Sequence, residues 1–320
     1  MKQLDVVALG ELLIDFTENG RSAQGNPILE ANPGGAPCNV LAMLNKLGKK
    51  TAFIGKVGSD TFGNQLRDTL VDVGIDTRGL AMDPQVHTTL AFVHTAPDGD
   101  RDFSFYRNPG ADMMLSEAEV PEELIKQSRI FHFGTLSMTH DGVRAATRKA
   151  LRCARENGLL ISFDPNLRPP LWESLDAAKE QIQYGLGWCD ILKISDNEVE
   201  FVTGLRDYDR AVEQILETYP NIRILFLTLG KDGSRVYYRD IRAEKGGFRV
   251  NTVDTCGAGD TFCGCALWYL LEQDWNTLDS SHLEQLLTFA NAAAALVTTR
   301  KGAIRSMPEL EEIQVLIAAQ

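Results

Sequence analysis

Four consecutive residues in the C-terminal third of the chain could combine anion binding with proton transfer. Gly257, Ala258 and Gly259 stand directly before Asp260, in the stretch NTVDTCGAGDTFCGCALWYLLEQ, and a helix-like apolar run follows them. Small residues at the start of a helix leave backbone N–H groups exposed, and these groups together with the helix dipole bind anions, most often phosphate. The same pattern also fits a tight turn from a strand into a helix, in which Asp260 serves only as a cap.

An acid beside a bound phosphate is unfavourable unless it has a chemical task. Asp260 would have one if it accepted the proton of a substrate hydroxyl while the N–H groups held the phosphoryl group being transferred. Such a reaction needs a nucleotide donor. The sequence contains neither a Gly-x-x-x-x-Gly-Lys-[Ser/Thr] loop nor a Gly-x-Gly-x-x-Gly motif, so P-loop enzymes, protein kinases and nicotinamide-dependent oxidoreductases lose their main support.

The elements that must position these residues alternate along the chain. Apolar, β-branched runs lie at 4–10, 51–58, 129–136, 159–166, 190–195 and 223–230, and helical patterns between them include 61–74, 141–158 and 174–186. This alternation predicts a mostly parallel sheet with helices on both faces. Because ligands of such sheets bind beyond the carboxyl ends of the strands, the polar residues that follow strands are the candidate site residues.

One region breaks this rhythm. The stretch 88–110 alternates apolar and polar residues around a Pro-Asp-Gly turn signal at 97–99, which predicts a β-hairpin. Together with the polar stretch 16–33, it is expected to form a small antiparallel flap over the ends of the main sheet. The segment 257–320 is expected to form two or three helices. No Pro/Ser-rich linker or internal repeat divides the chain, which indicates one α/β domain with a small lid.

The composition of the 320-residue chain limits the classes of partner. Acidic residues outnumber basic ones by 44 to 32, and the net charge of −12 argues against a nucleic-acid or anionic-membrane surface. No apolar run approaches the roughly 18 residues that a membrane helix needs. Asp5, Glu11 and Asp15 interrupt the N-terminal apolar run, which favours a buried strand over a signal peptide. Six cysteines without framework spacing favour a reducing cytoplasm, and the sequence has no Cys-x-x-Cys or His-Glu-x-x-His zinc motif.

Two distant motifs resemble the signatures of one family. DTCGAGDTF (254–262) is similar to the C-terminal signature of the ribokinase-like sugar kinases, the pfkB group, and PGGAPCNVLAMLNKLG (33–48) is similar to their N-terminal signature. Further similar stretches cover almost the whole chain, and RNPGADMML, DPNLRPPLW and ISDNEVEFVTG most resemble fructokinases. Two residues depart from the pattern: Ser195 replaces the Asn of the Asn-x-x-Glu motif, as it does in similar fructokinases, and Leu41 replaces a smaller residue.

The resemblance implies a ribokinase-like fold with three α/β/α layers and a mostly parallel central sheet. It also implies a single kinase domain over 1–320, with a small β lid formed by about 12–34 and 88–112. The family frequently dimerises through this lid, so a homodimer is expected.

The resemblance also implies the roles of individual residues. Asp260 is the expected catalytic base, ionised at neutral pH, and the N–H groups of Gly257, Ala258 and Gly259 form the anion hole. The implied sugar-binding residues are Asp15, Gly34, Gly35, Asn39, Arg107 and Arg168. The implied ATP-binding residues are Asn166, Glu198, Thr228, Gly230, Gly233 and Asn291. Asn166 and Glu198 are expected to organise Mg²⁺ largely through water. The residues that match a monovalent cation loop for K⁺ are Asp254, Cys256, Val297, Arg300, Gly302 and Ser306.

The implied function is an ATP-dependent kinase that phosphorylates the 6-hydroxyl of fructose. Two alternatives remain open at this point: the same chemistry on 2-keto-3-deoxygluconate, ribose or a riboside, and a catalytically silent sugar or nucleotide sensor on the same fold. A nicotinamide-dependent oxidoreductase is disfavoured because the sequence lacks its glycine fingerprint. The expected partners are ATP and a small sugar, without nucleic acid or membrane, in the cytoplasm.

Overall fold

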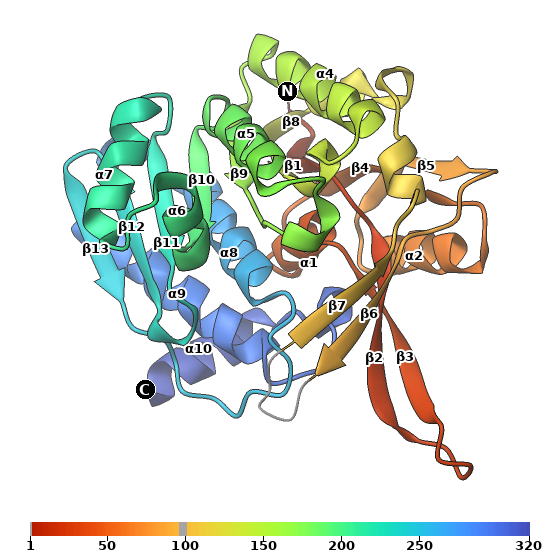
Figure 1. Ribbon diagram of the computed structural model, residues 1–320. Helices are drawn as coiled ribbons and strands as arrows, with labels where there is room; N and C mark the ends of the chain where they lie inside the picture. The colour runs from red at the N-terminus through yellow and green to blue at the C-terminus, as the bar shows by residue number, and fades with distance from the viewer. Residues whose placement is uncertain (1, 96–100) are drawn as a thin grey trace.

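The computed structural model describes residues 2–95 and 101–320, and its largest element is a sheet of nine strands (Figure 1). The strand order is β13-β12-β11-β10-β9-β8-β1-β4-β5. The strands are β1 (Leu4–Leu9), β4 (Thr51–Gly58), β5 (Asp76–Asp83), β8 (Ser128–Gly134), β9 (Leu160–Asp164), β10 (Ile191–Ser195), β11 (Ile224–Thr228), β12 (Ser234–Tyr238) and β13 (Ile241–Lys245). Only the pairs that involve β12 are antiparallel within this sheet. The mostly parallel sheet expected from the sequence is confirmed.

Three strands at or next to the edges of the sheet have no counterpart among the predicted ones. These are β5, β12 and β13. Polar residues interrupt all three, and β12 buries only alternate side chains. The sequence search used continuous apolar runs, which are typical of central parallel strands buried on both faces. It therefore passed over these more mixed edge strands.

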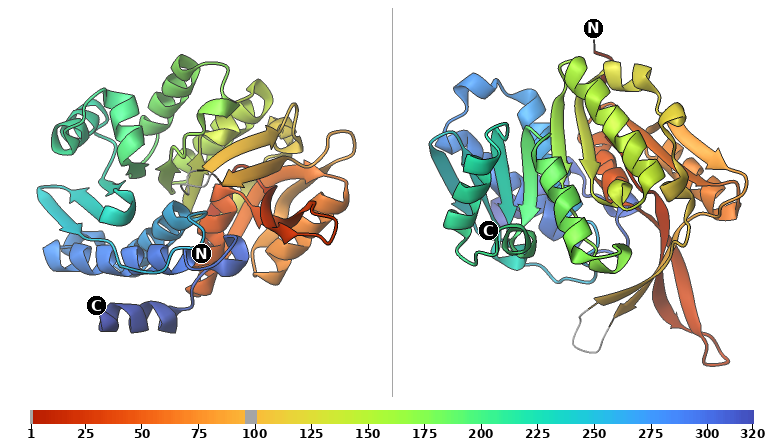
Figure 2. Two further views of the ribbon diagram at one scale, coloured as in Figure 1. Left: turned by 60° about the horizontal axis from the view of Figure 1, so that its bottom comes forward. Right: turned by 45° about the horizontal axis from the view of Figure 1, so that its top comes forward.

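Helices cover both faces of the large sheet and produce the expected three layers (Figures 1 and 2). The α-helices are α1 (Ala36–Lys46), α2 (Thr61–Asp72), α3 (Glu122–Lys126), α4 (Asp141–Glu156), α5 (Leu175–Leu186), α6 (Asp196–Thr203), α7 (Tyr208–Thr218), α8 (Ala258–Glu272), α9 (Ser280–Val297) and α10 (Leu310–Ala319). Val6 and Ala8 of β1 join a core formed with α1, α8 and α9, whereas Val7 and Leu9 join a second core formed with α4, α5 and α7. Successive side chains of β1 point to opposite faces of the sheet, so this strand contributes residues to both cores.

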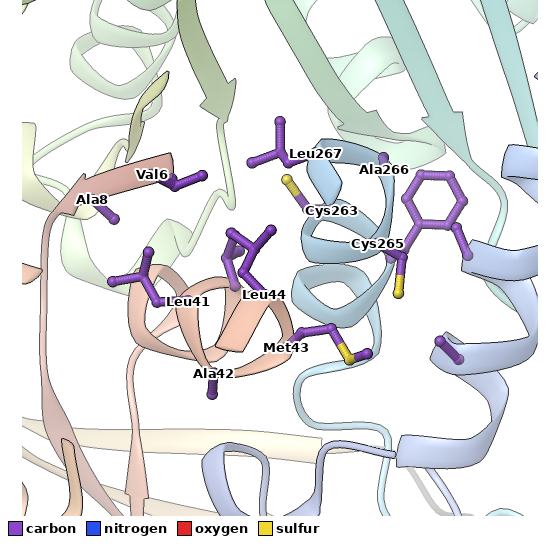
Figure 3. Packing of buried hydrophobic residues seen from close by; sticks show 14 of the residues in the cluster. Val6, Ala8, Leu41, Ala42, Met43, Leu44, Cys263, Cys265, Ala266 and Leu267 are labelled. Carbon is purple, nitrogen blue, oxygen red and sulfur yellow. The ribbon is translucent and has the colours of Figure 1, made fainter. Parts of the chain in front are cut away.

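Helices α1 and α8 pack directly against each other in the first of these cores (Figure 3). Leu41 and Leu44 of α1 and Cys263 and Leu267 of α8 are buried there. Gly264 faces α1 so closely that an added Cβ would lie 3.0 Å from the carbonyl oxygen of Val40. The cysteines of α8 are free thiols, as are the other four, and fill space in the core as expected. The close packing fixes the N-termini of the two helices relative to each other.

A second, four-stranded sheet leaves the body near the end of β1 (Figure 2). It consists of β2 (Leu13–Arg21), β3 (Pro27–Gly34), β6 (Leu90–Thr95) and β7 (Arg101–Tyr106), in the order β3-β2-β6-β7. The outer pairs are antiparallel, but the central pair of β2 and β6 is parallel, so the expectation of a wholly antiparallel flap is wrong. Both central strands continue outward from parallel strands, β2 from β1 and β6 from β5, and therefore run in the same direction. The turn signal at 97–99 lies outside the described residues.

Aromatic rings join the two central strands of this small sheet to each other and to helix α2 of the body. The ring of Phe16 on β2 lies 5.0 Å from that of Phe92 on β6 and 5.6 Å from that of Phe62 on α2. Aromatic pairs at these separations stabilise a contact beyond the area that they bury.

Among the residues that the structure describes, no helix has the length and apolarity needed to cross a membrane.

Candidate active site

The N-terminus of α8 is formed by the Gly-Ala-Gly-Asp sequence. Gly257 precedes the helix with a φ of 76°, a left-handed conformation that is costly for a residue with a Cβ, and a Cβ added there would lie 2.8 Å from that of Ala303. The carbonyl of Gly257 accepts the N–H of Thr261 at 2.8 Å and its hydroxyl at 2.7 Å. This turn leads into the first N–H groups of α8, which lack partners within the helix, and Asp260 lies directly beside them.

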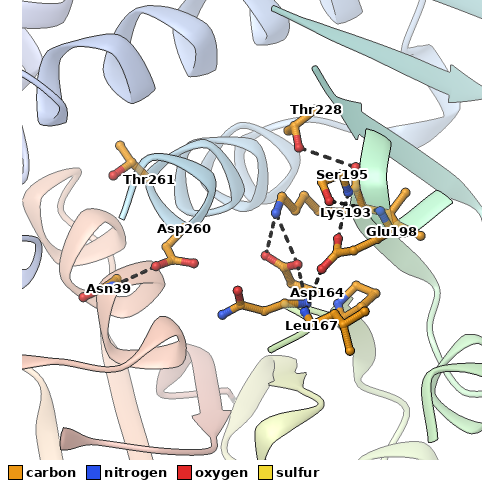
Figure 4. Close-up of polar contacts among 12 residues, drawn as sticks. Asn39, Asp164, Leu167, Lys193, Ser195, Glu198, Thr228, Asp260 and Thr261 are labelled. Atoms are coloured by element: carbon orange, nitrogen blue, oxygen red, sulfur yellow. Dashed lines mark hydrogen bonds and ion pairs between the residues drawn. The ribbon is translucent and has the colours of Figure 1, made fainter. Parts of the chain in front are cut away.

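Helix α1 holds Asp260 from the other side (Figure 4). The Nδ2 of Asn39 donates to the Oδ2 of Asp260 at 2.7 Å, although 221 positions separate the two residues in the sequence. Asn39 is buried, and its Oδ1 has no hydrogen-bond partner among the described residues. Leaving a buried amide oxygen without a partner costs free energy. This atom is therefore well suited to accept a hydrogen bond from a ligand hydroxyl.

Asp15 and two glycines meet at the start of α1. A Cβ on Gly34 would collide with the Oδ2 of Asp15, and a Cβ on Gly35, whose φ is 127°, would collide with the carbonyl oxygen of Glu11. The two glycines therefore let the chain after β1 approach α1 closely. The carboxylate of Asp15 lies at the same end of α1 as Asn39, so the structure brings the predicted sugar-binding residues Asp15, Gly34, Gly35 and Asn39 together.

A buried ion pair joins β9 and β10 on the other side of Asp260 (Figure 4). The Nζ of Lys193 lies 3.0 Å from the Oδ2 of Asp164 and 3.2 Å from its Oδ1, and both side chains are buried. Sequence reasoning did not single out Lys193. The available signal was a lysine within the otherwise apolar run DILKIS, because a lysine inside a central strand is buried only when it is paired.

The carboxylate of Glu198 ties the loops after β9 and β10 together. Its Oε1 accepts the N–H of Leu167 at 2.8 Å, and its Oε2 accepts the N–H of Ser195 at 2.9 Å. The hydroxyl of Ser195 in turn accepts the N–H of Glu198 at 3.4 Å, which completes a capping box at the start of α6. Serine is a good N-cap in place of asparagine, so the departure at Ser195 preserves the local structure. Asn166, with a φ of 44°, lies in the same loop as Leu167.

Burial dominates the electrostatics of this cluster. Desolvation raises the pKa of Asp260, and the hydrogen bond from Asn39 and the charges of Lys193 and Arg168 oppose this shift only in part. The helix dipole alone would lower the pKa of Asp260, so the shift is opposite to the one expected from the dipole. Desolvation would lower the pKa of Lys193, but the carboxylates of Asp164, Glu198 and Asp260 outweigh it and raise that pKa above its ordinary value. Lys193 therefore remains protonated across the physiological range.

A pocket of about 370 Å³ opens beside the start of α8. This volume lies within the range of small-molecule sites. Its apolar wall consists of Phe248, Val250, Phe262, Ala294 and Ala295, and it also contains Lys193, Gly259 and the predicted nucleotide residues Thr228, Gly230, Gly233 and Asn291. Asn166 and Glu198 are not among its lining residues. The amide of Asn291 bonds to Ser234 at 2.8 Å and to the carbonyl of Lys245 at 3.1 Å, so Asn291 supports the wall.

The two predicted arginines differ in their surroundings. Arg107 is buried, and its guanidinium contacts Asp112, Thr139 at 2.9 Å and the carbonyl of Leu136 at 3.0 Å. Any swing with the small sheet would break these bonds, which places Arg107 in a supporting position in this conformation. Arg168 is half-buried, and its charge offsets part of the rise that burial causes in the pKa of Asp260, which places it near the predicted catalytic base.

The predicted cation loop is assembled around Asp254. Its buried carboxylate accepts the N–H of Cys256 at 2.7 Å and the N–H of Gly302 at 3.2 Å. Val297, Arg300 and Ser306 lie in the neighbouring turn from the end of α9 to residue 306. Across residues 2–95 and 101–320, no group of three or more His, Cys, Asp or Glu side chains could hold a metal ion, so a metal here would depend on carbonyls, water or phosphate for its other ligands.

Comparisons with known proteins find similarity over almost the whole chain. A curated relative, Fructokinase-2 of Solanum lycopersicum, is 42% identical over 314 residues, which cover 98% of this chain and 95% of the relative. Among solved structures, the fructokinase of Xylella fastidiosa with bound ATP has a TM-score of 0.88 and 32% identity, and the match covers 100% of this chain and 99% of that one.

A second solved structure is a double mutant of the fructokinase of Vibrio cholerae with fructose, ADP and potassium ion bound. It has a TM-score of 0.87 and 29% identity, and the match covers 99% of both chains. The family model described as pfkB family carbohydrate kinase matches residues 3–310. This chain therefore belongs to the pfkB family of carbohydrate kinases.

Proposed function

We propose that this protein transfers the γ-phosphoryl group of ATP to the 6-hydroxyl of fructose and forms fructose 6-phosphate and ADP. The observation that carries the proposal is the position of Asp260, between the Asn39 amide on the sugar side and a pocket that reaches Gly259 on the nucleotide side. Relatives named fructokinase and solved fructokinases with ATP or with fructose and ADP support it.

Asp260 acts as the catalytic base in this scheme. Asn39 holds its Oδ2, which leaves Oδ1 to accept the proton of the sugar hydroxyl. In a loose phosphoryl-transfer transition state the base needs only to orient the hydroxyl and take the proton late. The N–H groups of Gly257, Ala258 and Gly259 stabilise the charge on the transferred group, because the start of a helix concentrates positive potential there.

Sugar recognition is assigned to the residues at the start of α1. Asp15 accepts hydrogen bonds from sugar hydroxyls, the unpaired Oδ1 of Asn39 accepts another, and Gly34 and Gly35 leave room for the ring. Arg168 is assigned to the phosphate or the product. Arg107 is assigned to the sugar side through the buried network that it holds with Asp112.

Magnesium is assigned to the loops that Glu198 joins. Mg²⁺ in kinases uses one or two protein groups together with phosphate oxygens and water. Asn166 and Glu198 fit this mode, because Asn166 stands in the loop that Glu198 holds, and the ion would neutralise phosphate charge. Thr228, Gly230, Gly233 and Asn291 are assigned to the nucleotide.

A potassium ion is proposed for the loop around Asp254. The carboxylate already orders the backbone of Cys256 and Gly302, and the carbonyls of Cys256, Val297, Arg300 and Gly302, with Ser306, would complete the oxygen ligands. The loop leads directly into Gly257, so a bound cation would stabilise the anion hole. Rates measured in K⁺, Na⁺ and Tris buffers test this assignment, and equal rates would contradict it.

The small sheet is proposed to act as a lid over the sugar and as the interface of a homodimer. The outer edges of its strands β3 and β7 pair with no further strand within the described residues, and unpaired strand edges are usually covered. The six free cysteines support a cytoplasmic location.

The substrate is tested by coupled ADP-release assays with fructose, ribose, 2-keto-3-deoxygluconate and a riboside. We expect the highest kcat/KM with fructose. Turnover of another sugar without turnover of fructose would reject the substrate assignment and keep the kinase assignment. Absence of turnover with any of them would favour a sugar or nucleotide sensor.

The catalytic base is tested by Asp260→Asn. The amide cannot accept the proton, so we expect kcat to fall by about 10²- to 10⁴-fold, the range for loss of general base catalysis. Fructose affinity, measured by calorimetry, should stay within a few-fold of the wild-type value. A near-normal kcat would overturn the assignment.

A further inference from the structure

Glu11 is a buried carboxyl group to which the proposed reaction assigns no role. It follows β1, and its Oε1 accepts the N–H of Ala36 at 2.7 Å, across 25 positions of the sequence. Ionisable side chains are rarely buried without a specific partner. The partner here is the first residue of α1, in the turn whose N–H groups have no acceptor within the helix.

Helix α1 has no side-chain cap of its own. The residue before it is Gly35, which has no side chain, and Pro37 in its first turn has no N–H group. A cap is usually supplied by the residue just before a helix. In this helix Glu11 takes that part for the N–H of Ala36, and the positive end of the helix dipole favours a carboxylate there.

The backbone around Glu11 packs closely against the same turn of α1. A Cβ added to Gly35 would collide with the carbonyl oxygen of Glu11, and a Cβ added to Gly10 would lie 2.5 Å from the Cγ of Pro37. The end of β1 and the start of α1 therefore form one closely packed unit, which the hydrogen bond between Glu11 and Ala36 joins from within.

This turn of α1 carries Asn39. The N–H of Asn39 donates to the carbonyl of Gly35 at 3.0 Å, and its Nδ2 donates to the Oδ2 of Asp260 at 2.7 Å. The Oδ1 of Asn39 has no partner among the described residues and is assigned to a sugar hydroxyl. Both the orientation of Asp260 and the contact with the sugar therefore depend on where the first turn of α1 lies.

The other charged groups near Glu11 are Arg107 and Asp112 at the base of the small sheet, and the thiol of Cys38 on α1 also lies near it. Arg107 and Asp112 form a buried ion pair with each other. The hydrogen bond to Ala36 is thus the direct contact that the structure shows for the carboxyl group of Glu11 with another residue.

We propose that Glu11 is a positioning residue of the sugar site: its carboxyl group fixes the first turn of α1 and thereby holds Asn39 in place beside Asp260. The inference rests on the proposed function in taking Asp260 as the base and Asn39 as a sugar contact, but it does not depend on which sugar is phosphorylated. The role requires an acceptor oxygen that reaches the N–H of Ala36, and it does not require a charge.

Three variants separate reach from charge. Glu11→Gln keeps the acceptor without the charge, Glu11→Asp keeps the charge on a shorter side chain, and Glu11→Leu keeps neither. We expect kcat/KM for fructose to fall by about 10- to 100-fold in Glu11→Leu and Glu11→Asp, as for a misplaced reacting group, and to stay within about threefold in Glu11→Gln. The KM for ATP should change by less than about twofold, because the described residues that line the nucleotide pocket include none from α1. Activity kept in Glu11→Asp and lost in Glu11→Gln would overturn the proposal.

A double-mutant cycle with Asn39→Ala tests whether Glu11 acts through Asn39. Asn39→Ala alone should lower kcat/KM for fructose. Adding Glu11→Leu should then lower it further by less than about twofold, because the group that Glu11 positions is already absent. If the losses of the two single variants multiply in the double variant, Glu11 acts independently of Asn39 and the proposal is wrong.

Asp190→Leu is the matched control. The Oδ2 of Asp190 accepts the N–H of Ile161 at 2.8 Å, but Asp190 precedes β10 and lies at the opposite end of that strand from Ser195. Its loss should lower the Tm and leave kcat/KM for fructose within about twofold of the wild-type value. The same pattern in Glu11→Leu would show a purely structural role and would reject the proposal.

Two further outcomes are decisive. If Glu11→Leu does not fold, Glu11→Asp replaces it in the cycle and in the comparison with the control. If the wild type does not phosphorylate fructose, the substrate assignment fails, and hydrogen exchange still tests Glu11. Amides in the first turn of α1 should then exchange faster in Glu11→Asp than in the wild type, and equal exchange would reject the role of Glu11. The two failures are therefore distinguishable.

Discussion

Burial raises the pKa of two carboxyl groups, Asp260 and Glu11, which serve different purposes. Asp260 is half-buried beside the nucleotide pocket, and a raised pKa makes its carboxylate a better proton acceptor. Glu11 is buried, and its Oε1 accepts the N–H of Ala36 at 2.7 Å at the start of α1. Desolvation raises its pKa to about 7, with Asp112 adding to the shift and Arg107 opposing it.

Glu11 should make the stability of the protein depend on pH. Its pKa in the folded state is about 7, above the ordinary value of 4.5, so the folded protein binds one more proton than the unfolded chain between these values. The free energy of unfolding therefore falls as the pH rises through this interval. For Glu11→Gln, whose amide oxygen can still accept the N–H of Ala36, we expect this fall to be smaller by about 3 kcal/mol.

Urea denaturation of both proteins at several pH values from 4.5 to 8 measures this difference. Between pH 4.5 and pH 8, the free energy of unfolding of Glu11→Gln should fall by less than that of the wild type. Parallel pH profiles of wild type and Glu11→Gln would show that Glu11 titrates near its ordinary pKa in the folded protein.

At the scale of elements, the start of α8 depends on the turn at Gly257. The left-handed φ of 76° and the contact with Ala303 both oppose a side chain there. Gly257→Ala should therefore displace the N-terminus of α8, and with it the N–H groups assigned to the anion hole. We expect a loss of stability of about 1–2 kcal/mol from the backbone alone and a decrease in kcat of at least about tenfold, since a single stabilising N–H group contributes more than this.

Gly158→Ala separates the two effects. Gly158 follows α4 with a φ of 67°, and an added Cβ would meet no atom within 4 Å. This variant should lose a similar amount of stability in thermal unfolding and keep the wild-type kcat. If both variants lost stability and both kept kcat, the geometry of the α8 turn would have no part in catalysis.

The central elements were predictable because their patterns are local. The sequence placed α2, α4 and α5 within two residues of their observed ends, since each has an apolar stripe and polar caps. The strands β12 and β13 near one edge of the sheet, and the parallel pairing of β2 with β6, were not predictable in this way. Pairing direction depends on where the chain leaves the large sheet, which no window of sequence records.

At the scale of the whole molecule, the small sheet presents apolar residues to solvent. Ile28 and Leu29 on β3 are 46% and 44% exposed, and Tyr106 on β7 is 67% exposed. We expect a homodimer through this sheet, with a mass in solution of twice the 35.4 kDa of one chain. Leu29→Asp should shift the equilibrium towards monomer, because a charge in an apolar interface is poorly solvated.

Light scattering across working concentrations measures the mass. Val315→Asp on α10 is the control, since Val315 is 68% exposed on a helix away from the small sheet, and it should leave the mass unchanged. A monomer mass of the wild type at all concentrations would contradict the dimer, and an equal effect of both variants would contradict its location.

The sequence by itself determined the alternating strands and helices of the body, the glycine turn into the helix that carries Asp260, and the resemblance to the sugar kinases. These features are encoded by neighbouring residues or by short motifs, so they can be recognised without the fold. Candidate residues such as Asp15, Asn39 and Glu198 followed from the same motifs.

Only the tertiary structure decided how these residues act on one another. It joined Asn39 to Asp260 across 221 positions, paired Lys193 with Asp164 beside Gly259, and raised the pKa of Asp260. Burial and charge interactions depend on distances between segments that are remote in the chain. The chemistry of a carboxyl group or an ammonium group is therefore set when packing removes water from around it and brings distant charges near.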